Sequence, residues 1–262
     1  MKIAIIGAGN VATHLALALS VREEIVQVMA RTEESAQRLV RQIPGDAEPV
    51  TDYSRLTPDA DHYLISVNDD AVASVVDSTP DFPGMWAHTS GSVGAEVFQG
   101  KKSRYGVFYP LQTFSRDLPV KMEEVPMFIE GSSHEAEATL CALARTIAGP
   151  VEIAGSERRK ALHVAAVFAC NFANLMWLEA DSLLADSGLS VSFFRPLLEA
   201  TLGKLSTMSP RDAMTGPGRR GDLEVISDHL SRLPEQQRRM YAMLSRRILE
   251  IYHPDKASEI HI

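Results

Sequence analysis

The sequence predicts an α/β protein in which a parallel sheet flanked by helices is followed by an all-helical region. Three observations support this prediction. Short apolar runs alternate with stretches of helical periodicity as far as residue 154. From Ser156 onward no convincing strand appears, and long helical patterns follow one another. A glycine pattern at Gly7 and Gly9 separates the first apolar run from the first helical stretch.

The elements of the first region alternate in type along the chain. The expected strands are short apolar runs, at residues 2–7, 25–30, 62–67, 85–90, 105–110, 127–131 and 151–154. The expected helices carry apolar residues at helical spacing, at residues 10–20, 33–43, 69–77 and 133–147. Such alternation is typical of a sheet whose helices pack on its faces.

The second region contains only predicted helices, at residues 157–187, 190–207, 222–232 and 235–252. Glycine and proline residues separate them, at Gly188, Pro210, residues 216–221 and Pro234. Because the pattern changes near Gly155, we predict a first domain at residues 1–154 and a second at residues 155–262.

Composition narrows the class of protein. The 262 residues are 45% hydrophobic and 23% charged, as in a globular chain, and the net charge of -8 argues against a nucleic-acid-binding protein. The two cysteines, Cys141 and Cys170, lack metal-ligand spacing, so we expect neither a metal site nor a disulfide framework, and a reducing, cytoplasmic setting. Residues 161–180 are long enough for a membrane span but contain several polar residues, which favours a buried amphipathic helix and no membrane.

The stretch "IAIIGAGNVATHLALAL" contains a G-x-G-x-x-A pattern between a strand and a helix. Gly7 permits a tight turn, Gly9 lets the backbone approach a pyrophosphate, and Ala12 allows the helix to pack closely on the strand. The helix N-terminus then faces the phosphates, where Asn10 and Val11 are expected to contact the cofactor. This context favours a Rossmann-type dinucleotide site over a simple glycine turn.

The end of the second strand discriminates between the nicotinamide cofactors, because an acid there binds a ribose hydroxyl and an arginine accommodates a 2′-phosphate. The sequence places Arg31 and Thr32 at this position, with no acid before them. Glu33 and Glu34 fit the first helical turn behind Thr32 as N-cap. We therefore expect NADP rather than NAD, although a solvated arginine at a strand end is the alternative.

Two further strand ends are expected at the same crevice, since ligands of open α/β sheets collect beyond the carboxyl ends of strands. One carries Val67 and Asn68, and the other carries Ser90. These residues are predicted cofactor contacts. A helix cap at Asn68 and a turn at Ser90 are the structural alternatives.

The first helix of the second region carries polar residues on a narrow stripe. At ~100° per residue, Lys160, Asn171 and Asn174 share this stripe, and His163 lies at its edge. Lys160 or His163 is a candidate proton donor to a substrate, with Asn171 as a further catalytic candidate and Asn174 as a substrate contact. Alternatively, these residues form a helix-start cation, a satisfied core histidine and interhelical hydrogen bonds.

Three stretches behind the glycine pattern, "GVFYPLQTFS" (106–115), "LHVAAVFACNFANL" (162–175) and "TGPGRRGD" (215–222), resemble a known family. It is a Rossmann-like NADP oxidoreductase family whose second domain is of unknown function. The family is related to pyrroline-5-carboxylate reductase and 6-phosphogluconate dehydrogenase.

The resemblance implies a helical dimerisation domain and roles for His163, Asn171 and Arg220. The family has histidine before the proline of its middle motif, where this chain has Tyr109, a residue we expect to contact substrate.

We therefore expect an NADP-dependent oxidoreductase that transfers hydride to or from a small, polar, anionic substrate in the cleft between the domains. Arg220 is the expected anion contact, because arginine grips a carboxylate or phosphate in two places. An imine or opine reductase, or a redox sensor that binds NADPH without turnover, is the alternative. The expected assembly is a homodimer through residues 155–262.

Overall fold

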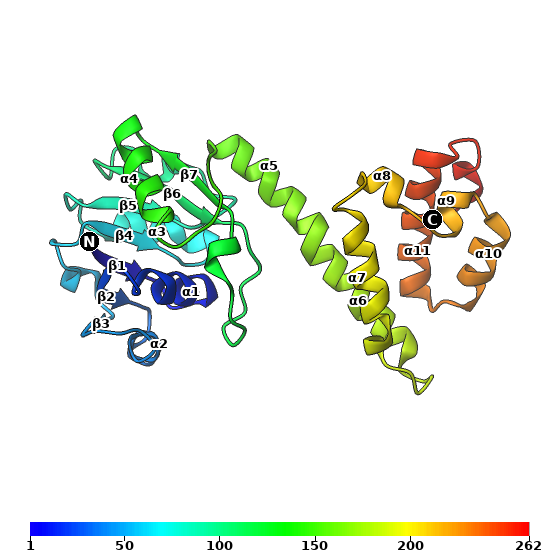
Figure 1. The fold of residues 1–262 in the computed structure, drawn as a ribbon, viewed down its shortest axis with the longest axis horizontal. Helices are drawn as coiled ribbons and strands as arrows, with labels where there is room; N and C mark the ends of the chain where they lie inside the picture. Colours follow the sequence, from blue (N-terminus) through cyan, green and yellow to red (C-terminus); the bar gives the residue numbers. More distant parts are fainter. Residues whose placement is uncertain (262) are drawn as a thin grey trace. The chain divides into compact units, whose positions relative to one another are not determined.

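The computed structural model describes residues 1–261 and divides the chain into two compact units, Met1–Asn171 and Phe172–Ile262. The first unit contains the sheet and the start of the long helix that follows it (Figure 1). The sheet ends at Ile153 and the helices begin at Ser156, whereas the two units divide within the long helix.

The sheet has eight strands in the order β3-β2-β1-β4-β5-β6-β7-β8. Their bounds are β1 Lys2–Ile6, β2 Glu24–Met29, β3 Glu48–Val50, β4 His62–Ile65, β5 Met85–His88, β6 Tyr105–Pro110, β7 Met127–Gly131 and β8 Val151–Ile153. The predicted fold class is confirmed. The three-residue strand β3 was not predicted, because a short stretch containing Pro49 carries no strand pattern.

The expectation of a fully parallel sheet is wrong at one pairing. Strand β7 runs antiparallel to β6, with Tyr109 opposite Phe128 and Pro110 opposite Met127. The segment between these strands contains only a short 3-10 helix, and it returns to the sheet edge from which it left. Parallel neighbours require a connection that crosses to the opposite end of the sheet. This segment does not cross, so β7 runs antiparallel to β6.

Both faces of the sheet are covered. Alternate residues of β1 point to opposite faces: Ile3 and Ile5 pack with α1, α2 and α4, while Ala4 and Ile6 pack with α3. These helices are α1 Asn10–Leu19, α2 Glu33–Val40, α3 Asp69–Ser78 and α4 His134–Ala144. All four were predicted from their periodicity, and Thr32 caps α2 by accepting a hydrogen bond from the Ser35 amide, as expected.

The long helix after the sheet is not uniform. It consists of α5 Ser156–Ala166, a π-helical segment Val167–Phe172 and α6 Ala173–Leu184. A π-helical turn holds more residues than an α-helical turn, so the residues beyond it are rotated relative to those before it. The expectation that Lys160, Asn171 and Asn174 share one stripe assumed a regular helix, and this assumption is wrong.

The second unit continues with further helices, α7 Arg195–Lys204, α8 Pro210–Ala213, α9 Pro217–Arg220, α10 Leu223–Arg232 and α11 Glu235–Tyr252. The "TGPGRRGD" stretch forms α9, a single short helix between two glycines of positive φ, Gly216 at 98° and Gly221 at 71°. Asp222 then caps α10 by accepting from the Val225 amide. The predicted break at residues 216–221 and the helix after it are therefore confirmed, although the break contains the short helix α9.

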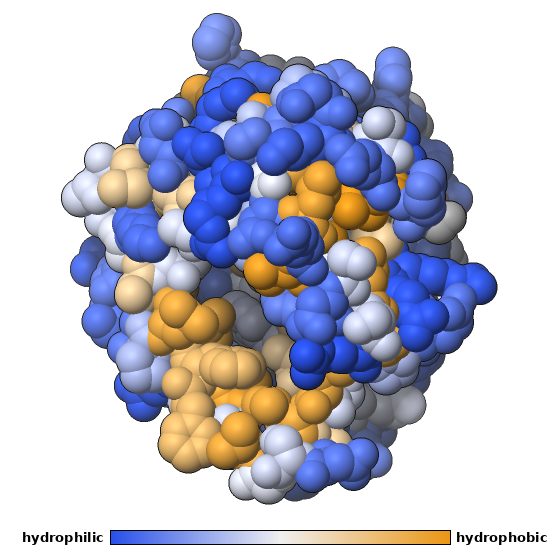
Figure 2. Space-filling view, turned by 90° about the vertical axis from the view of Figure 1, so that its right-hand side faces the viewer, coloured by the Kyte–Doolittle hydropathy of each residue, from blue (hydrophilic) through white to orange (hydrophobic). Residues whose placement is uncertain are grey.

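The expectation that residues 161–180 form a buried helix is wrong for the single chain. By length and composition, the helix Ser156–Leu184 is long and apolar enough to cross a membrane, and within the described chain its most apolar stretch is not buried. Leu178, Phe193 and Leu202 are each more than 60% exposed. Figure 2, which views the chain from the side of the second unit, shows apolar side chains gathered on the surface.

Candidate functional site

A cavity of about 730 Å³ lies in the first unit, beyond the carboxyl ends of the central strands. It is lined by residues that follow β1, β2, β4 and β5, together with residues of β6 and α5. The predicted cofactor contacts that line it are Gly7, Gly9, Asn10, Val11, Arg31, Thr32, Val67, Asn68 and Ser90. The sheet topology thus brings together residues that lie up to 83 positions apart, from Gly7 to Ser90.

The turn after β1 has the geometry that a dinucleotide phosphate requires. Gly7 has a φ of 123°, and a Cβ there would lie 2.0 Å from the Ser66 carbonyl oxygen. A Cβ on Gly9 would meet nothing within 4 Å, so the backbone is open to a ligand. Helix α1 begins here without a side-chain cap or an acid in its first turn, which leaves its amide groups free for an anion. Ala12, fully buried, packs the helix on the sheet.

The end of β2 and one side of the short helix α2 form a second anion-binding region on the cavity wall. Arg31, Thr32, Ser35 and Arg38 all line the cavity at this end. Among residues 1–261, neither Arg31 nor Arg38 belongs to an ion pair, although many arginines of this chain do. Two unpaired guanidiniums and two hydroxyls suit a ribose 2′-phosphate.

The segment after β6 crosses the start of α1 as a strap, which we define as residues 111–118. Asn10 donates to the Phe114 carbonyl at 2.9 Å, and His14 Nε2 lies 3.0 Å from the Ser115 carbonyl. The rings of His14 and Phe114 are 5.0 Å apart. The strap also places the exposed Arg116 on the cavity wall. The Asn10 side chain is therefore bound to protein, while its backbone amide remains part of the helix start.

The loop after β5 lies at the other end of the cavity. Asn68 occupies the N-cap position of α3 but makes no side-chain cap bond, so its amide is available to a ligand. Next to it, Asp69 accepts a hydrogen bond from the Ser92 hydroxyl. Ser90 and Gly91 complete this wall. A carboxylate, an amide and a hydroxyl thus face the same space.

Tyr109 and His163 form a hydrogen-bonded pair on the cavity wall. The Tyr109 hydroxyl lies 3.0 Å from His163 Nδ1, and the two rings meet edge to face. Burial raises the pKa of the Tyr109 hydroxyl above its usual value, and the carboxylate of Asp69 raises it further. Tyr109 therefore keeps its proton at neutral pH. The pair joins β6 to α5, whose Leu162 packs beside Tyr109.

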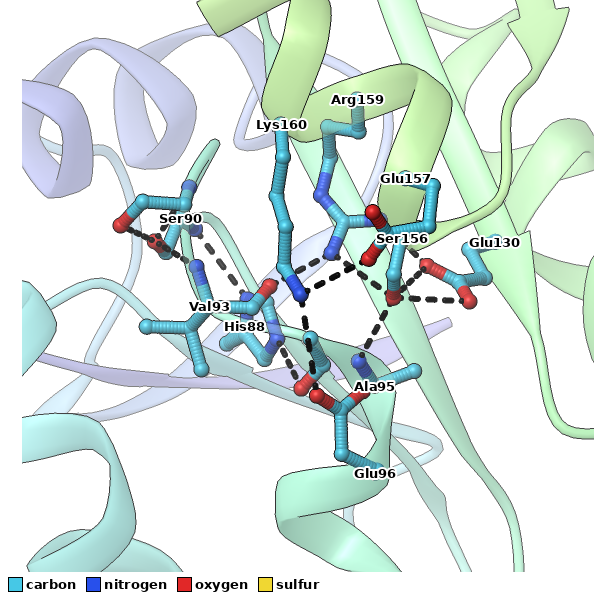
Figure 3. A network of polar contacts seen from close by, with 12 residues as sticks. His88, Ser90, Val93, Ala95, Glu96, Glu130, Ser156, Glu157, Arg159 and Lys160 are labelled. Carbon is cyan, nitrogen blue, oxygen red and sulfur yellow. Dashed lines mark hydrogen bonds and ion pairs between the residues drawn. The ribbon is translucent and has the colours of Figure 1, made fainter.

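The remaining predicted site residues are not among those that line this cavity in residues 1–261. Lys160 points to acids instead: its Nζ lies 3.1 Å from Glu157 Oε1 and 4.0 Å from Glu96 Oε1 (Figure 3). Asn171 is an exposed residue of the π-helical segment. Asn174 and Arg220 belong to the second unit, where Arg220 lies 3.7 Å from Asp222.

Sequence reasoning did not assign several of the residues that line this cavity, including Ser35, Arg38, Gly91, Gln112, Phe114 and Arg116. Arg38 carried a usable signal, because it lies seven residues beyond Arg31, in the last turn of the short helix α2. The strap residues carried no such signal apart from the resemblance of their motif. The 16-residue connection between β6 and β7 has no periodicity from which its path could be predicted.

Comparison with known proteins is consistent with this geometry. Residues 2–86 match the family described as NADP oxidoreductase, coenzyme F420-dependent, and residues 125–248 match a domain of unknown function, DUF2520. No curated protein matches the chain. The structural neighbours include a crystal structure named as a putative NADP oxidoreductase from Bacteroides fragilis, with 42% identity, a TM-score of 0.89, and coverage of 95% of this chain and 98% of that chain.

Two more distant structures share the fold. The 1-pyrroline-5-carboxylate reductase of Streptococcus pyogenes is 15% identical, with a TM-score of 0.66 and coverage of 99% of this chain and 98% of that one. A reductive aminase of Aspergillus terreus, solved with NADPH, is 14% identical, with a TM-score of 0.63 and coverage of 96% and 87%. The 42% identity over nearly the whole length decides the assignment: this chain belongs to the family of NADP oxidoreductases that join a Rossmann-type domain to a DUF2520 helical domain.

Proposed function

We propose that this protein is an NADP-dependent reductase of a C=O or C=N bond in a small polar substrate, and that Tyr109 and His163 manage the proton. The observation that carries this proposal is the 3.0 Å contact between the Tyr109 hydroxyl and His163 Nδ1 on the wall of the dinucleotide cavity. Arg31 follows β2 and Tyr109 lies on β6, with β1, β4 and β5 between them. A dinucleotide whose 2′-phosphate binds at Arg31 would extend across the strand ends toward this pair.

The chemistry follows from the two side chains. NADPH, when bound, supplies the hydride. The substrate then needs a proton on its oxygen or nitrogen, and the Tyr109 hydroxyl is a donor whose raised pKa keeps it protonated beforehand. His163, hydrogen-bonded to that hydroxyl, is placed to return a proton to Tyr109 after the transfer. Lys160 is less suited to this role because Glu157 and Glu96 hold its ammonium group.

The fold neighbours favour a C=N substrate within this proposal. Those named for a reductive aminase, an imine reductase and a 1-pyrroline-5-carboxylate reductase share the fold at 14–16% identity. For an imine, Tyr109 would donate its proton to the nitrogen before the hydride arrives, and the carboxylate of Asp69 on the cavity wall would stabilise the positive charge until the hydride neutralises it. An imine or imino acid reductase is therefore the more specific form of the proposal.

Three single variants test the proton donor. Tyr109→Phe should lower the turnover of NADPH with an accepted substrate by roughly 100- to 10,000-fold, the usual contribution of general acid catalysis. His163→Asn should lower it as well, and both variants should bind NADPH as tightly as the unmodified protein in a fluorescence titration. Lys160→Ala should retain turnover. If Lys160→Ala abolishes turnover and Tyr109→Phe does not, the donor is the lysine.

A panel of small ketones and imines, with and without an amine, provides the substrates for this assay. A protein that binds NADPH tightly but oxidises it with no member of the panel would support the alternative of a redox sensor.

We further propose that Arg220 binds an anionic group of the substrate, from its own chain or from a second copy. Its fork-shaped guanidinium is 63% exposed and lies 3.7 Å from Asp222, at the end of the short helix α9. Arg220→Lys keeps the charge and loses the fork, so the KM for the substrate should rise about tenfold while the melting temperature barely changes. A large fall in melting temperature with an unaltered KM would make the Arg220 to Asp222 contact a purely structural clamp.

We propose that a second copy of this chain, rather than a membrane, covers the apolar surface of α6 and α7. The same long helix carries Arg159, Lys160 and Glu179, whose charges disfavour a hydrocarbon environment. A symmetric dimer would bury the exposed leucines of the second unit against themselves. The proposal is completed by small-molecule substrates, a cytoplasmic location and no nucleic-acid partner, the last of which the net charge of -8 supports.

A further inference from the structure

A largely buried ion pair lies at the start of α5, between residues that do not line the cavity within the described chain. The Arg159 side chain is completely inaccessible, and its guanidinium pairs with Glu130 of β7 (Figure 3). The same guanidinium donates to the Val93 carbonyl at 2.5 Å. Ser156 Oγ lies 2.9 to 3.0 Å from the Glu130 carboxylate oxygens and accepts from the Ala95 amide at 3.2 Å. One charge pair thus joins β7, α5 and the loop after β5.

A buried histidine, His88, also stabilises that loop through two hydrogen bonds to the loop backbone. The Ser90 amide donates to His88 Nδ1 at 3.2 Å, and His88 Nε2 faces the Gly94 carbonyl at 3.4 Å. Both contacts are satisfied by the neutral ring that carries its proton on Nε2. Burial, and then the positive charge of Arg159, lower the pKa of His88 to about 4, which keeps the ring neutral. The Ser90 hydroxyl accepts from the Val93 amide at 3.0 Å and completes the turn.

The loop contacts the proton-managing pair directly at Gly91. A Cβ at this position would lie 2.6 Å from His163 Nδ1 and 2.8 Å from Tyr109 Cζ. The loop backbone therefore packs against both partners of the 3.0 Å hydrogen bond. Arg159 precedes His163 by one helical turn on the same helix, so it holds the loop to the element that carries the histidine.

We propose that Arg159 is a positioning residue for the Tyr109–His163 pair. Through Glu130 and Val93 it fixes the loop against α5, and the loop in turn sets how closely the tyrosine and histidine approach. Desolvating two charges opposes folding, so a buried pair of this kind is better explained by the geometry it imposes than by stability. The inference depends on the proposed function only for its effect on catalysis. The Tyr109–His163 contact that Arg159 is proposed to control can be measured without turnover.

The test compares Arg159→Lys with Arg158→Lys, its exposed neighbour, in the full-length protein. The lysine keeps a positive charge beside Glu130, but one ammonium group cannot also hold the Val93 carbonyl as the guanidinium fork does. The readout is the side-chain ¹⁵N NMR spectrum of histidine-labelled protein, in which His163 is assigned by its loss in His163→Asn. Tyr109→Phe provides the signal expected when the pair is broken.

We expect Arg159→Lys to move the His163 Nδ1 signal toward the position seen in Tyr109→Phe, and Arg158→Lys to leave it in place. With an accepted substrate, Arg159→Lys should lower kcat roughly 10- to 100-fold and leave the KM for NADPH within about twofold, because small displacements of a reacting group have such effects. Ser156→Ala keeps the ion pair but removes the hydrogen bond to the Ala95 amide, so the His163 signal should shift less, in the same direction. This variant replaces Arg159→Lys in the test if Arg159→Lys does not fold.

An unchanged His163 signal in the folded variants would overturn the positioning role while leaving the pair intact. If Tyr109→Phe itself leaves the His163 signal unchanged, the hydrogen bond is absent in solution, and the failure lies with the proposed function rather than with Arg159.

Discussion

The two units differ in how they use apolar residues. The first unit buries its large side chains in two clusters, one on each face of the sheet. In the second unit a small cluster packs α10 and α11 around Ile226 and Leu249, whereas α6 and α7 contain no buried residue within the described chain. A sheet whose two faces are covered by helices of the same chain buries its apolar side chains without a partner molecule. The exposed apolar helices of the second unit therefore carry the surface that we propose a second copy covers.

The largest effect should come from placing charge on that surface. Leu178→Glu combined with Leu202→Glu should convert a dimer into a monomer, raising its dissociation constant by roughly 1,000-fold, since burying unpaired carboxylates costs about 4 kcal/mol or more. Light scattering after size-exclusion chromatography measures the mass. The matched control is Val21→Glu, at an apolar residue of the first unit that is 79% exposed. An unmodified protein that is monomeric at micromolar concentration would contradict the proposed dimer and would show that the contrast between the units has another cause.

Acid should weaken the first unit selectively. Burial lowers the pKa of both His62 and His88 to about 4, from an ordinary value of 6.5. Between these values the unfolded chain binds protons that the folded chain does not, so stability is complete above about pH 6.5 and falls as the pH drops toward 4. Each histidine should contribute a loss of roughly 3 kcal/mol over this range.

Urea unfolding at pH 7.5 and pH 5, followed by the fluorescence of Trp86 in the sheet, measures this loss. Because Trp177 of the second unit would mix into the signal, the measurement uses the Trp177→Phe background. His62→Gln should remove about half of the pH dependence. An equal pH dependence in that variant would mean that His62 is not the group responsible.

Two arginine variants should have a smaller effect, on cofactor affinity. They should distinguish the site of the 2′-phosphate from the site of the pyrophosphate. Arg31→Ala should weaken NADPH binding by roughly 10- to 100-fold and leave NADH binding nearly unchanged, because a charge-assisted bond to the 2′-phosphate contributes about 1.5 to 3 kcal/mol. Arg116, on the strap, is expected to contact the pyrophosphate, which both cofactors contain. Arg116→Ala should therefore weaken the binding of NADH and NADPH equally. Fluorescence titration of each cofactor gives the constants, and Arg22→Ala, outside the cavity, is the control. Equal affinity of the unmodified protein for NADH and NADPH would contradict the predicted NADP preference.

Much of the fold was accessible to sequence reasoning because its signals are local. The apolar runs that became β1, β2 and β4 to β8, and the periodicity of α1 to α4, depend on neighbours a few residues away. The glycine requirement at Gly7 is equally local, since its left-handed φ belongs to the turn itself. For the same reason the cap of α10 at Asp222 could be read from the "TGPGRRGD" stretch.

Other features depended on which segments meet in space. The antiparallel direction of β7 followed from the path of a connection without periodicity. The π-helical segment contains Asn171 and precedes Asn174, so neither residue keeps the rotation that a regular helix would give it relative to Lys160. Arg159, one of three adjacent basic residues, is completely buried in the fold, and no local sequence pattern indicates this burial.

The sequence by itself determined the longer strands and helices, the phosphate-binding turn and the cofactor class, because backbone propensity, apolar periodicity and glycine geometry act over a few residues. Tertiary structure alone decided the Tyr109–His163 contact, which joins residues 54 positions apart, and the Arg159–Glu130 pair, which joins residues 29 apart. Such contacts depend on the register of strands and the rotation of a helix. A one-residue slip in a strand would turn Tyr109 to the opposite face of the sheet.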